Sequence, residues 1–448
     1  MFDLQFYLTA LVVVVGFYAA WNIGANDVAN AMGTSVGSGA LTLKQAVIIA
    51  GVFEFLGAFM VGANVSETVR KKMFDPEFFQ TIYGQDGPLL LALAMIAALM
   101  SAGTWLMFAS YRGWPVSTTH SIVGAVVGVG AVALGVENIA WGKVALITAG
   151  WVVSPLLSGI VAFVMFKFLL KSVFHKEDPV SAAKKIAPYL SFMVLLVLAG
   201  VVAFKGLKPL WKTLKVDPSD SGVLFFVACA ALGVAFIGML ITRQLVGRIR
   251  PVGKRLSDTG AEVLPDSSID RAGHSEMQAV ERIFAGLQIL TASIVAFAHG
   301  SNDVANAVGP MSAAYQAIST GEIGLQADVP PWMLALGGAG IVTGLAMWGW
   351  RVIETVGKRI TELTPSRGFV SEFSAAIVIL MASVMPLGLP VSTTHTLVGA
   401  VIGVGLARGF GAIDLSVAKV IVTSWMITIP AGATLSIGFY FMLKSVIL

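Results

Sequence analysis

A polar motif that occurs twice in this chain contains asparagine and aspartate residues, which could bind a cation. The segments Gly24–Gly33 and Gly300–Gly309 share the hexapeptide Asn-Asp-Val-Ala-Asn-Ala and are identical at eight of ten positions. Carboxylate and amide oxygens are hard ligands that suit Na⁺. A carboxylate in hydrocarbon costs roughly 2.5–3.5 kcal/mol on insertion scales, so it persists where it faces a cavity, a partner or a cation.

A helix would bring the polar residues of each copy onto one face, because residues four apart are neighbours on a helix. The members are Asn22, Asn26, Asn30 and Asp27 in the first copy, and Asn302, Asn306 and Asp303 in the second. Glycine and proline interrupt both copies and predict broken or unwound helices at Gly24, Gly33, Gly300, Gly309 and Pro310. Interhelical hydrogen bonding is the alternative role, but retention of both acids favours an ion site.

A second duplicated motif predicts an anion site. Pro-Val-Ser-Thr-Thr-His occurs at Pro115–His120 and again at Pro390–His395, each time before an apolar, glycine-rich run. Proline ends the preceding element, and Ser or Thr then caps a new helix. The free N–H groups and hydroxyls of two such termini could share a tetrahedral oxyanion, although plain capping is the simpler reading of one copy alone. The donors would be Ser117, Thr118, Thr119, Ser392, Thr393 and Thr394.

Four further titratable residues lie in apolar surroundings and are candidates for ion coupling. Glu54 lies well inside its apolar run, whereas Glu372 is expected to mark a helix entrance. His120 and His395 could respond to protons near neutral pH, but a structural role is favoured. The sequence contains no Cys/His cluster at zinc-ligand spacing and no Gly-x-Ser-x-Gly elbow, so neither an enzyme nor a resident cofactor is expected.

The composition places these motifs in a membrane. Of 448 residues, 56% are apolar and 12% charged, with a mean hydropathy of +0.84, against about 25% charged in a soluble protein. A net charge of +4 does not suggest nucleic acid as a partner. About twelve apolar runs approach the length that spans a bilayer and predict an all-α polytopic protein. They lie near 4–23, 43–63, 88–110, 115–135, 142–171, 188–204, 221–242, 282–301, 332–350, 370–388, 390–407 and 417–443.

The duplication divides the chain into two repeats, 1–171 and 282–448. Residues 172–242 have no counterpart and are expected to be scaffold or dimer contact. The basic stretch 243–281 is expected to be a cytoplasmic linker, and the N-terminus, with Asp3 and no basic residue, is expected outside. If the two repeats start on opposite sides of the membrane, they are inverted, and an odd number of membrane crossings must separate their first residues. The count is seven if 115–135 crosses and six if it folds back as a hairpin.

At these four motifs the chain resembles the inorganic phosphate transporter (PiT) family of cation-coupled phosphate symporters. The family signature is similar to residues 24–31 and 300–307, and its hairpin motif to 115–120 and 390–395. The resemblance implies inverted repeats with re-entrant hairpins, phosphate held by hairpin tips and Asn-Asp helices, Na⁺ or H⁺ beside it, and a homodimer. The short linker resembles prokaryotic members, which implies the inner membrane.

The sequence thus predicts a symporter that imports phosphate with Na⁺. The Ser and Thr hydroxyls would bind phosphate, Asn26, Asn30, Asn302 and Asn306 would span phosphate and cation, and Asn22, Asp27, Asp303, Thr118 and Thr393 would hold Na⁺. Because phosphate beside two carboxylates is repelled until cations arrive, the charges would couple the two fluxes. H⁺-coupled transport of phosphate or a metal-phosphate complex, transport of sulfate or another oxyanion, and a channel remain alternatives.

Overall fold

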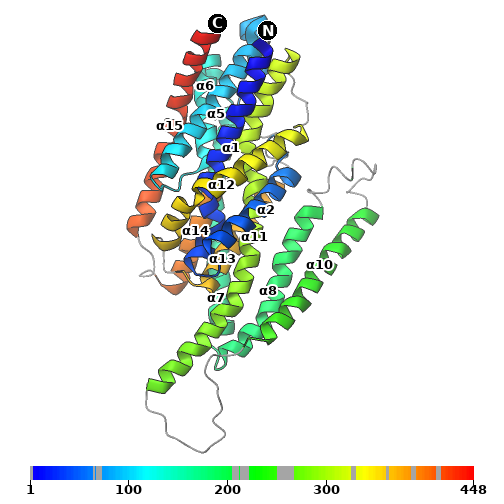
Figure 1. Ribbon diagram of the computed structural model, residues 1–448, viewed down its shortest axis with the longest axis vertical. Helices are drawn as coiled ribbons and strands as arrows, with labels where there is room; N and C mark the ends of the chain where they lie inside the picture. Colours follow the sequence, from blue (N-terminus) through cyan, green and yellow to red (C-terminus); the bar gives the residue numbers. More distant parts are fainter. Residues whose placement is uncertain are drawn as a thin grey trace, which may run out of the picture.

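A computed structural model describes residues 4–63, 66, 73–203, 211, 221–249, 267–323, 329–359, 363–384, 390–409 and 415–448. Within these ranges the chain is helical, and its β structure is limited to one isolated bridge between Phe74 and Ile139. Figure 1 shows the helices gathered into an elongated bundle with both termini at the same end.

Each of the twelve apolar runs lies mainly in one helix over its described residues, which confirms an all-helical membrane protein. The runs near 188–204 and 370–388 end outside the described ranges. Ten helical stretches of the described residues are long and apolar enough to cross a bilayer, while α6 and α14, with 17 and 16 residues, are shorter. The described α-helices are α1 (Leu4–Gly37), α2 (Leu43–Val61), α4 (Glu77–Tyr83), α5 (Gly87–Tyr111), α6 (Thr118–Leu134), α7 (Trp141–Leu169), α8 (Pro179–Val201), α10 (Ser221–Gly247), α11 (Ser267–Thr320), α12 (Pro331–Arg359), α13 (Pro365–Val384), α14 (Thr393–Arg408) and α15 (Leu415–Ile447).

The two helices that carry the Asn-Asp motifs, α1 and α11, lie antiparallel and side by side. At the start of α1, the Gln5 amide donates to the carbonyls of Ile318 and Ser319, near the end of α11, over 3.1 and 3.3 Å. Just past the opposite end of α1, the Ser38 hydroxyl donates to Gln288 over 2.7 Å. Equivalent helices of the two halves therefore run in opposite directions through the centre of the molecule (Figure 1).

Both motif helices are continuous, so the expected helix breaks are wrong. α1 runs through Gly24 and Gly33, and α11 runs through Gly300, Gly309 and Pro310. Two of the glycines instead allow close approach to the other half. A Cβ at Gly24 would lie 2.8 Å from the Cα of Ile341 on α12, and one at Gly300 would lie 2.7 Å from the Cα of Glu54 on α2. Small residues are selected where helix backbones meet in a membrane.

Two helical hairpins approach the centre with their tips. In the first, α5 and α6 return to the same end of the molecule, where the Tyr83 hydroxyl donates to the carbonyl of Ala133 over 2.6 Å. In the second, α13 precedes α14, and residues 385–389 between them lie outside the described ranges. Each hairpin packs on the opposite half, α6 against α15 and α14 against α7. The two halves are therefore interlocked.

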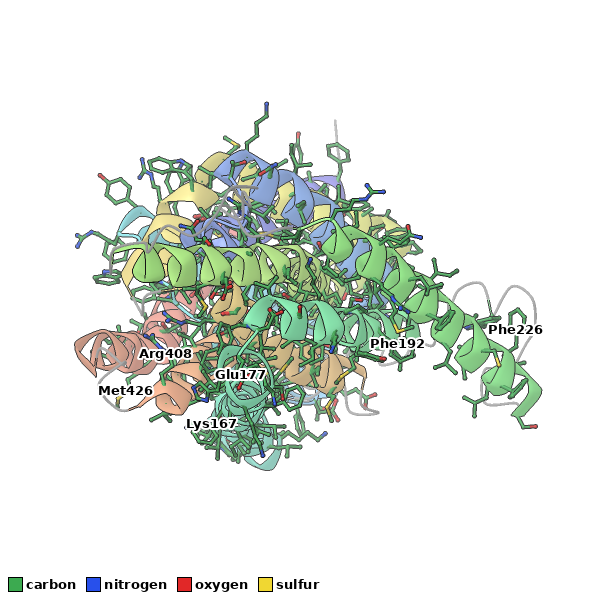
Figure 2. All side chains as sticks on the ribbon, turned by 90° about the horizontal axis from the view of Figure 1, so that it is seen from below. Lys167, Glu177, Phe192, Phe226, Arg408 and Met426 are labelled. Carbon is green, nitrogen blue, oxygen red and sulfur yellow. The ribbon has the colours of Figure 1, made fainter. Side chains whose placement is uncertain are left out.

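The unduplicated segment lies beside this bundle (Figure 1). α7 continues into a short π-helical turn, Leu170–Phe174, and then α8, close to the predicted boundary at residue 171. α10 packs on α8 at the periphery, where Phe226 is exposed (Figure 2). Helices extend into both ends of the predicted linker, 243–281, since α10 continues to Gly247 and α11 begins at Ser267. Residues 250–266 lie outside the described ranges. Residues 267–281 are polar, so an apolar-run criterion cannot detect them as helix.

Candidate functional site

The polar residues of both Asn-Asp motifs are buried where α1 and α11 pass each other. Asp27 and Asp303 are fully buried, and the asparagines that follow them by three positions, Asn30 and Asn306, are at most 3% exposed. A buried acid without partners would cost several kcal/mol. The surrounding helices must therefore supply polar partners, and the hairpin tips do so.

Each hairpin tip begins a helix with a capped N-terminus, as predicted. The Ser117 side chain accepts a hydrogen bond from the N–H of His120 over 3.2 Å, and Ser392 accepts from His395 over the same distance. Both serines have extended backbones, which is the conformation of an N-cap residue. The serines therefore serve the helix ends directly, and the first-turn N–H groups of the threonines that follow have no partner within the helix.

Each aspartate contacts the hairpin of its own half. The Thr118 hydroxyl donates to Oδ2 of Asp27 over 2.8 Å, and the Thr393 hydroxyl donates to Oδ2 of Asp303 over 2.8 Å. Hydrogen bonds to ionised groups are stronger than neutral ones. The two halves therefore share this Thr–Asp hydrogen bond and its length, in addition to the motif sequence.

Each of the following asparagines contacts the hairpin of the other half. Nδ2 of Asn30 donates to the hydroxyl of Thr394 over 2.7 Å, and Nδ2 of Asn306 donates to Thr118 and Thr119, each over 3.3 Å. The hairpin tips also join directly, because Thr119 donates to the carbonyl of Val391 over 3.2 Å. One buried cluster therefore forms only when both halves are present.

The asparagines that precede the aspartates fix the hairpin loops. Asn26 donates to the Trp114 carbonyl over 3.0 Å and accepts from the N–H of Val116 over 3.3 Å. Asn302 lies 3.0 Å from the Ser383 hydroxyl on α13. Asn22, one turn earlier on α1, donates to the carbonyl of Tyr18 within its own helix. The structure thus brings together every predicted motif residue except Asn22, which does not reach the hairpins.

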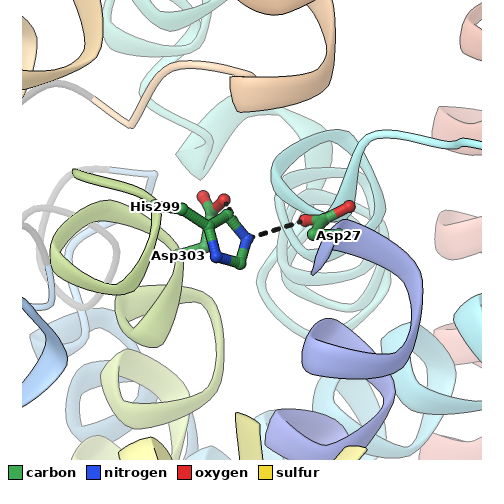
Figure 3. Close-up of side chains that lie close together, drawn as sticks. All are labelled: Asp27, His299 and Asp303. Carbon is green, nitrogen blue, oxygen red and sulfur yellow. Dashed lines mark ion pairs between the residues drawn. The ribbon is translucent and has the colours of Figure 1, made fainter. Parts of the chain in front are cut away.

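A histidine that the motif analysis gave no role stands at the centre of the acids. Nε2 of His299 lies 3.0 Å from Oδ2 of Asp303 and 3.5 Å from Oδ2 of Asp27 (Figure 3). Nδ1 of the same ring lies 3.2 Å from Oε1 of Glu54. The Asp27, His299 and Asp303 donor atoms lie within 4.8 Å of one another, a spacing that could hold a metal ion. The sequence signal was its position four residues before Asp303, on the same helical face.

The two glutamates have different surroundings. Glu54 lies on α2 against His299 and belongs to the central cluster. Glu372 is inside α13 and fully buried, so its expected position at a helix entrance is wrong. It lies in a second polar cluster at the end of α1, where four side chains donate to its carboxylate. The donors are Thr34, Ser35, Gln288 and Thr291.

The two hairpin histidines face each other away from the acids. The rings of His120 and His395 meet edge to face with centroids 4.3 Å apart, and Trp151 of α7 lies 3.8 Å from His120. The two rings lie at the contact between α6 and α14. Neither ring is hydrogen-bonded to the carboxylate of Asp27 or Asp303.

These features define a class of protein. A buried polar cluster, assembled from two halves of a helical chain that spans a membrane many times, is the arrangement of a membrane transporter. Comparison with known proteins identifies the family. The model of the phosphate transporter family matches residues 23–436, and the chain belongs to this family. It is a family of transporters, which confirms the expectation that the protein is not an enzyme.

Individual relatives agree with the family assignment. The inorganic phosphate transporter 2-1, chloroplastic, of Arabidopsis thaliana is 44% identical over 96% of this chain and 71% of its own length. A relative in Chlamydia muridarum is 46% identical over 99% of this chain and 100% of its own. Among solved structures, one described as the sodium-dependent phosphate transporter matches 99% of this chain and 100% of its own with a TM-score of 0.83 and 38% identity.

Proposed function

We propose that this phosphate transporter is a secondary symporter that imports inorganic phosphate with Na⁺. The observation that carries the proposal is the crossed pattern of contacts, in which each aspartate bonds its own hairpin and each following asparagine bonds the other. A tetrahedral anion held between two helix termini would receive hydroxyl and N–H donors from both halves. The similarity to a sodium-dependent phosphate transporter supports Na⁺ as the coupling ion.

In this proposal Thr118, Thr119, Thr393 and Thr394 donate to phosphate, together with the N–H groups at the starts of α6 and α14, while Ser117 and Ser392 hold those starts in place. The amides of Asn30 and Asn306 exchange their hydrogen bonds with the hairpin hydroxyls for hydrogen bonds with the anion. Asp27 and Asp303 hold Na⁺ with the neighbouring threonine oxygens. Because two buried carboxylates repel phosphate, the anion binds only after cations neutralise them.

We also propose that the two halves are inverted repeats about this site. The antiparallel packing of α1 on α11 supports the inversion. If α5 and α6 form a re-entrant hairpin, neither crosses, and α1, α2, α7, α8 and α10 give five crossings between the two starts. That odd number supports inverted repeats, with an outside N-terminus and a cytoplasmic linker in the inner membrane. A homodimer through the exposed apolar faces of α8 and α10 stays a prediction.

Proton coupling is the second candidate, and His299 favours it. An imidazole within reach of three carboxylates can carry one proton where the first candidate places Na⁺. Both candidates share the phosphate site and differ only in the driving ion.

Uptake of labelled phosphate into proteoliposomes tests the proposal. We expect an inward Na⁺ gradient at fixed pH to drive uptake, an equal K⁺ gradient not to, and excess sulfate to have no effect. Uptake driven by a pH gradient without Na⁺ would favour proton coupling, and inhibition by sulfate would widen the substrate class. Uptake that equilibrates without accumulation under any gradient would indicate a channel.

Two matched variants test the role of the acids. Asp27→Asn and Asp303→Asn keep the shape of the side chain and remove its charge, so each should weaken the Na⁺ dependence of uptake. The K₀.₅ for Na⁺ at fixed phosphate concentration measures the effect. Wild-type Na⁺ dependence in both variants would refute the cation-binding role of these residues.

A further inference from the structure

The two hairpin histidines occupy equivalent places in the repeat but make different contacts. Each is the third residue of its hairpin helix, and its backbone N–H donates to the capping serine, Ser117 or Ser392, over 3.2 Å. Neither ring nitrogen of His120 has a hydrogen-bond partner among the described residues. His395, in contrast, hydrogen-bonds the backbone of Trp151 on α7 through Nδ1. The two halves therefore differ at this pair of rings.

A proline explains why the carbonyl of Trp151 is open to a side chain. Inside a helix this carbonyl would accept a hydrogen bond from the N–H four residues later. That residue is Pro155, which lies inside α7 and has no N–H. The N–H of Trp151 has a helical acceptor four residues earlier, so the His395 ring is the donor and the carbonyl is its acceptor. His395 thus supplies the hydrogen bond that α7 lacks at this turn.

Further contacts hold the start of α14 against the same part of α7. The Ser158 hydroxyl donates to the carbonyl of Thr396, the residue after His395, over 2.6 Å. One turn later, a Cβ at Gly399 would lie 2.6 Å from the Cα of Pro155, so the two backbones meet without a side chain between them. The hydrogen bond of His395 therefore belongs to a close fit between α14 of the second half and α7 of the first.

The first hairpin has the equivalent proline but not the hydrogen bond. Pro430 lies inside α15, 275 residues after Pro155. The carbonyl that it deprives of a helical partner belongs to Met426, whose side chain is exposed (Figure 2). His120 does not bond this carbonyl, since both of its ring nitrogens lack a partner within the described part of the chain. Its ring instead lies against that of Trp151, with the two centroids 3.8 Å apart.

His395 directly follows the two threonines of the proposed phosphate site. Thr393 donates to Asp303 over 2.8 Å, and Thr394 accepts from Asn30 over 2.7 Å. Because side chains of one helical turn move with the backbone that carries them, the bond from His395 to α7 also fixes both threonines. It fixes the first-turn N–H groups of α14 in the same way, since these belong to the same turn.

We propose that His395 is a positioning residue, which holds the phosphate donors of the second hairpin in place through the carbonyl that Pro155 frees in α7. His395 acts through the first turn of α14, and His120 has no such role. Phosphate binding therefore depends unequally on the two histidines, although the motif around them is duplicated. The inference rests on the proposed phosphate site and is independent of which cation drives uptake.

Matched substitutions at both histidines test this difference. Asparagine and leucine have nearly the same shape, but only asparagine carries an amide N–H, which takes the place of the Nδ1 donor. Uptake of labelled phosphate is measured for His395→Asn, His395→Leu, His120→Asn and His120→Leu in proteoliposomes, under the gradient that drives the wild type. KM for phosphate should be about tenfold higher in His395→Leu than in His395→Asn, the loss of one hydrogen bond. The two variants of His120 should have the same KM.

The two kinetic constants separate positioning from folding. Loss of a positioning contact raises KM and leaves the maximal rate per folded transporter unchanged, whereas a purely structural defect reduces the amount of folded transporter. Equal KM values for His395→Asn and His395→Leu, or the same rise in His120→Leu, would overturn the inference while leaving phosphate transport intact. If His395→Leu does not fold, His395→Gln replaces it, because its amide nitrogen takes the position of Nε2 and the same rise in KM is expected.

A binding measurement distinguishes failure of the inference from failure of the proposed function. If the wild type takes up no phosphate, the proposed function fails, and equilibrium dialysis of the detergent-solubilised protein against labelled phosphate decides the inference. The Kd for phosphate should then be about tenfold higher for His395→Leu than for His395→Asn. Equal Kd values, or a wild type that binds no phosphate, would overturn the inference.

Discussion

Replacing Gly300 by alanine should displace the helix that carries the central histidine. The new Cβ would lie 2.7 Å from the Cα of Glu54 on α2, with the Glu54 carbonyl closer still, whereas carbon atoms in favourable contact are about 3.5 Å apart. α11 and α2 must therefore separate by at least about 0.8 Å, the difference between these distances, because the closer carbonyl oxygen requires still more room. The same shift would lengthen the contact of His299 with Glu54 from 3.2 Å to about 4 Å, beyond hydrogen-bonding range.

The matched control is Gly286→Ala on the same helix, where a Cβ meets nothing within 4 Å. Removing a helical glycine there should stabilise by up to about 1 kcal/mol, while overpacking at Gly300 should destabilise by about 1–3 kcal/mol. Thermal unfolding in detergent should therefore separate the variants by about 1–4 kcal/mol, the sum of the two effects. Gly300→Ala should also lose ion-driven uptake. A Gly300→Ala protein with the uptake and melting temperature of Gly286→Ala would refute this reasoning.

Three further substitutions test the contacts around the site. Asn30→Ala and Asn306→Ala should each raise KM for phosphate by about tenfold, the loss of one hydrogen bond, and markedly unequal effects in uptake assays would contradict a site shared by the two halves. Ser392→Ala removes the cap of α14 and should cost about 1 kcal/mol in thermal unfolding, with Ser392→Thr as the control that restores it. Glu372→Ala leaves four buried donors without their acceptor and should cost about 3 kcal/mol or more, so a melting temperature equal to wild type would contradict the described cluster.

The sequence predicted the helices and the paired motifs because both follow from local patterns. Apolar runs determine which segments cross a bilayer, and the Pro-Val-Ser-Thr-Thr-His motif contains the signals that start a helix. Duplication then identified the residues that belong together, including Thr118 with Asp27. Contacts within one repeat could be predicted in this way because both partners recur at nearly the same offset, 276 residues for Asp27 and 275 for Thr118.

The contacts between the two repeats could not be predicted from the sequence. Nothing in a single copy indicates that Asn30 bonds Thr394, because that contact depends on how two antiparallel helices pass each other. Glycine was misread as a helix break for the same reason, since its use at Gly24 and Gly300 is to admit a backbone from the other half. His299 has no counterpart in the first copy, where Ile23 stands, so a search for duplicated polar residues passes over it.

The interlocking of the halves has a consequence for biogenesis. Asp27 leaves the ribosome with the first helix, whereas Asp303, His299 and Thr394 follow more than 270 residues later. During that interval the polar stripe of α1 is in the membrane without the side chains that later surround it, and Thr118 of the first hairpin is the first partner to arrive. Insertion of the first half therefore yields an intermediate whose polar core stays incomplete until the second half is inserted.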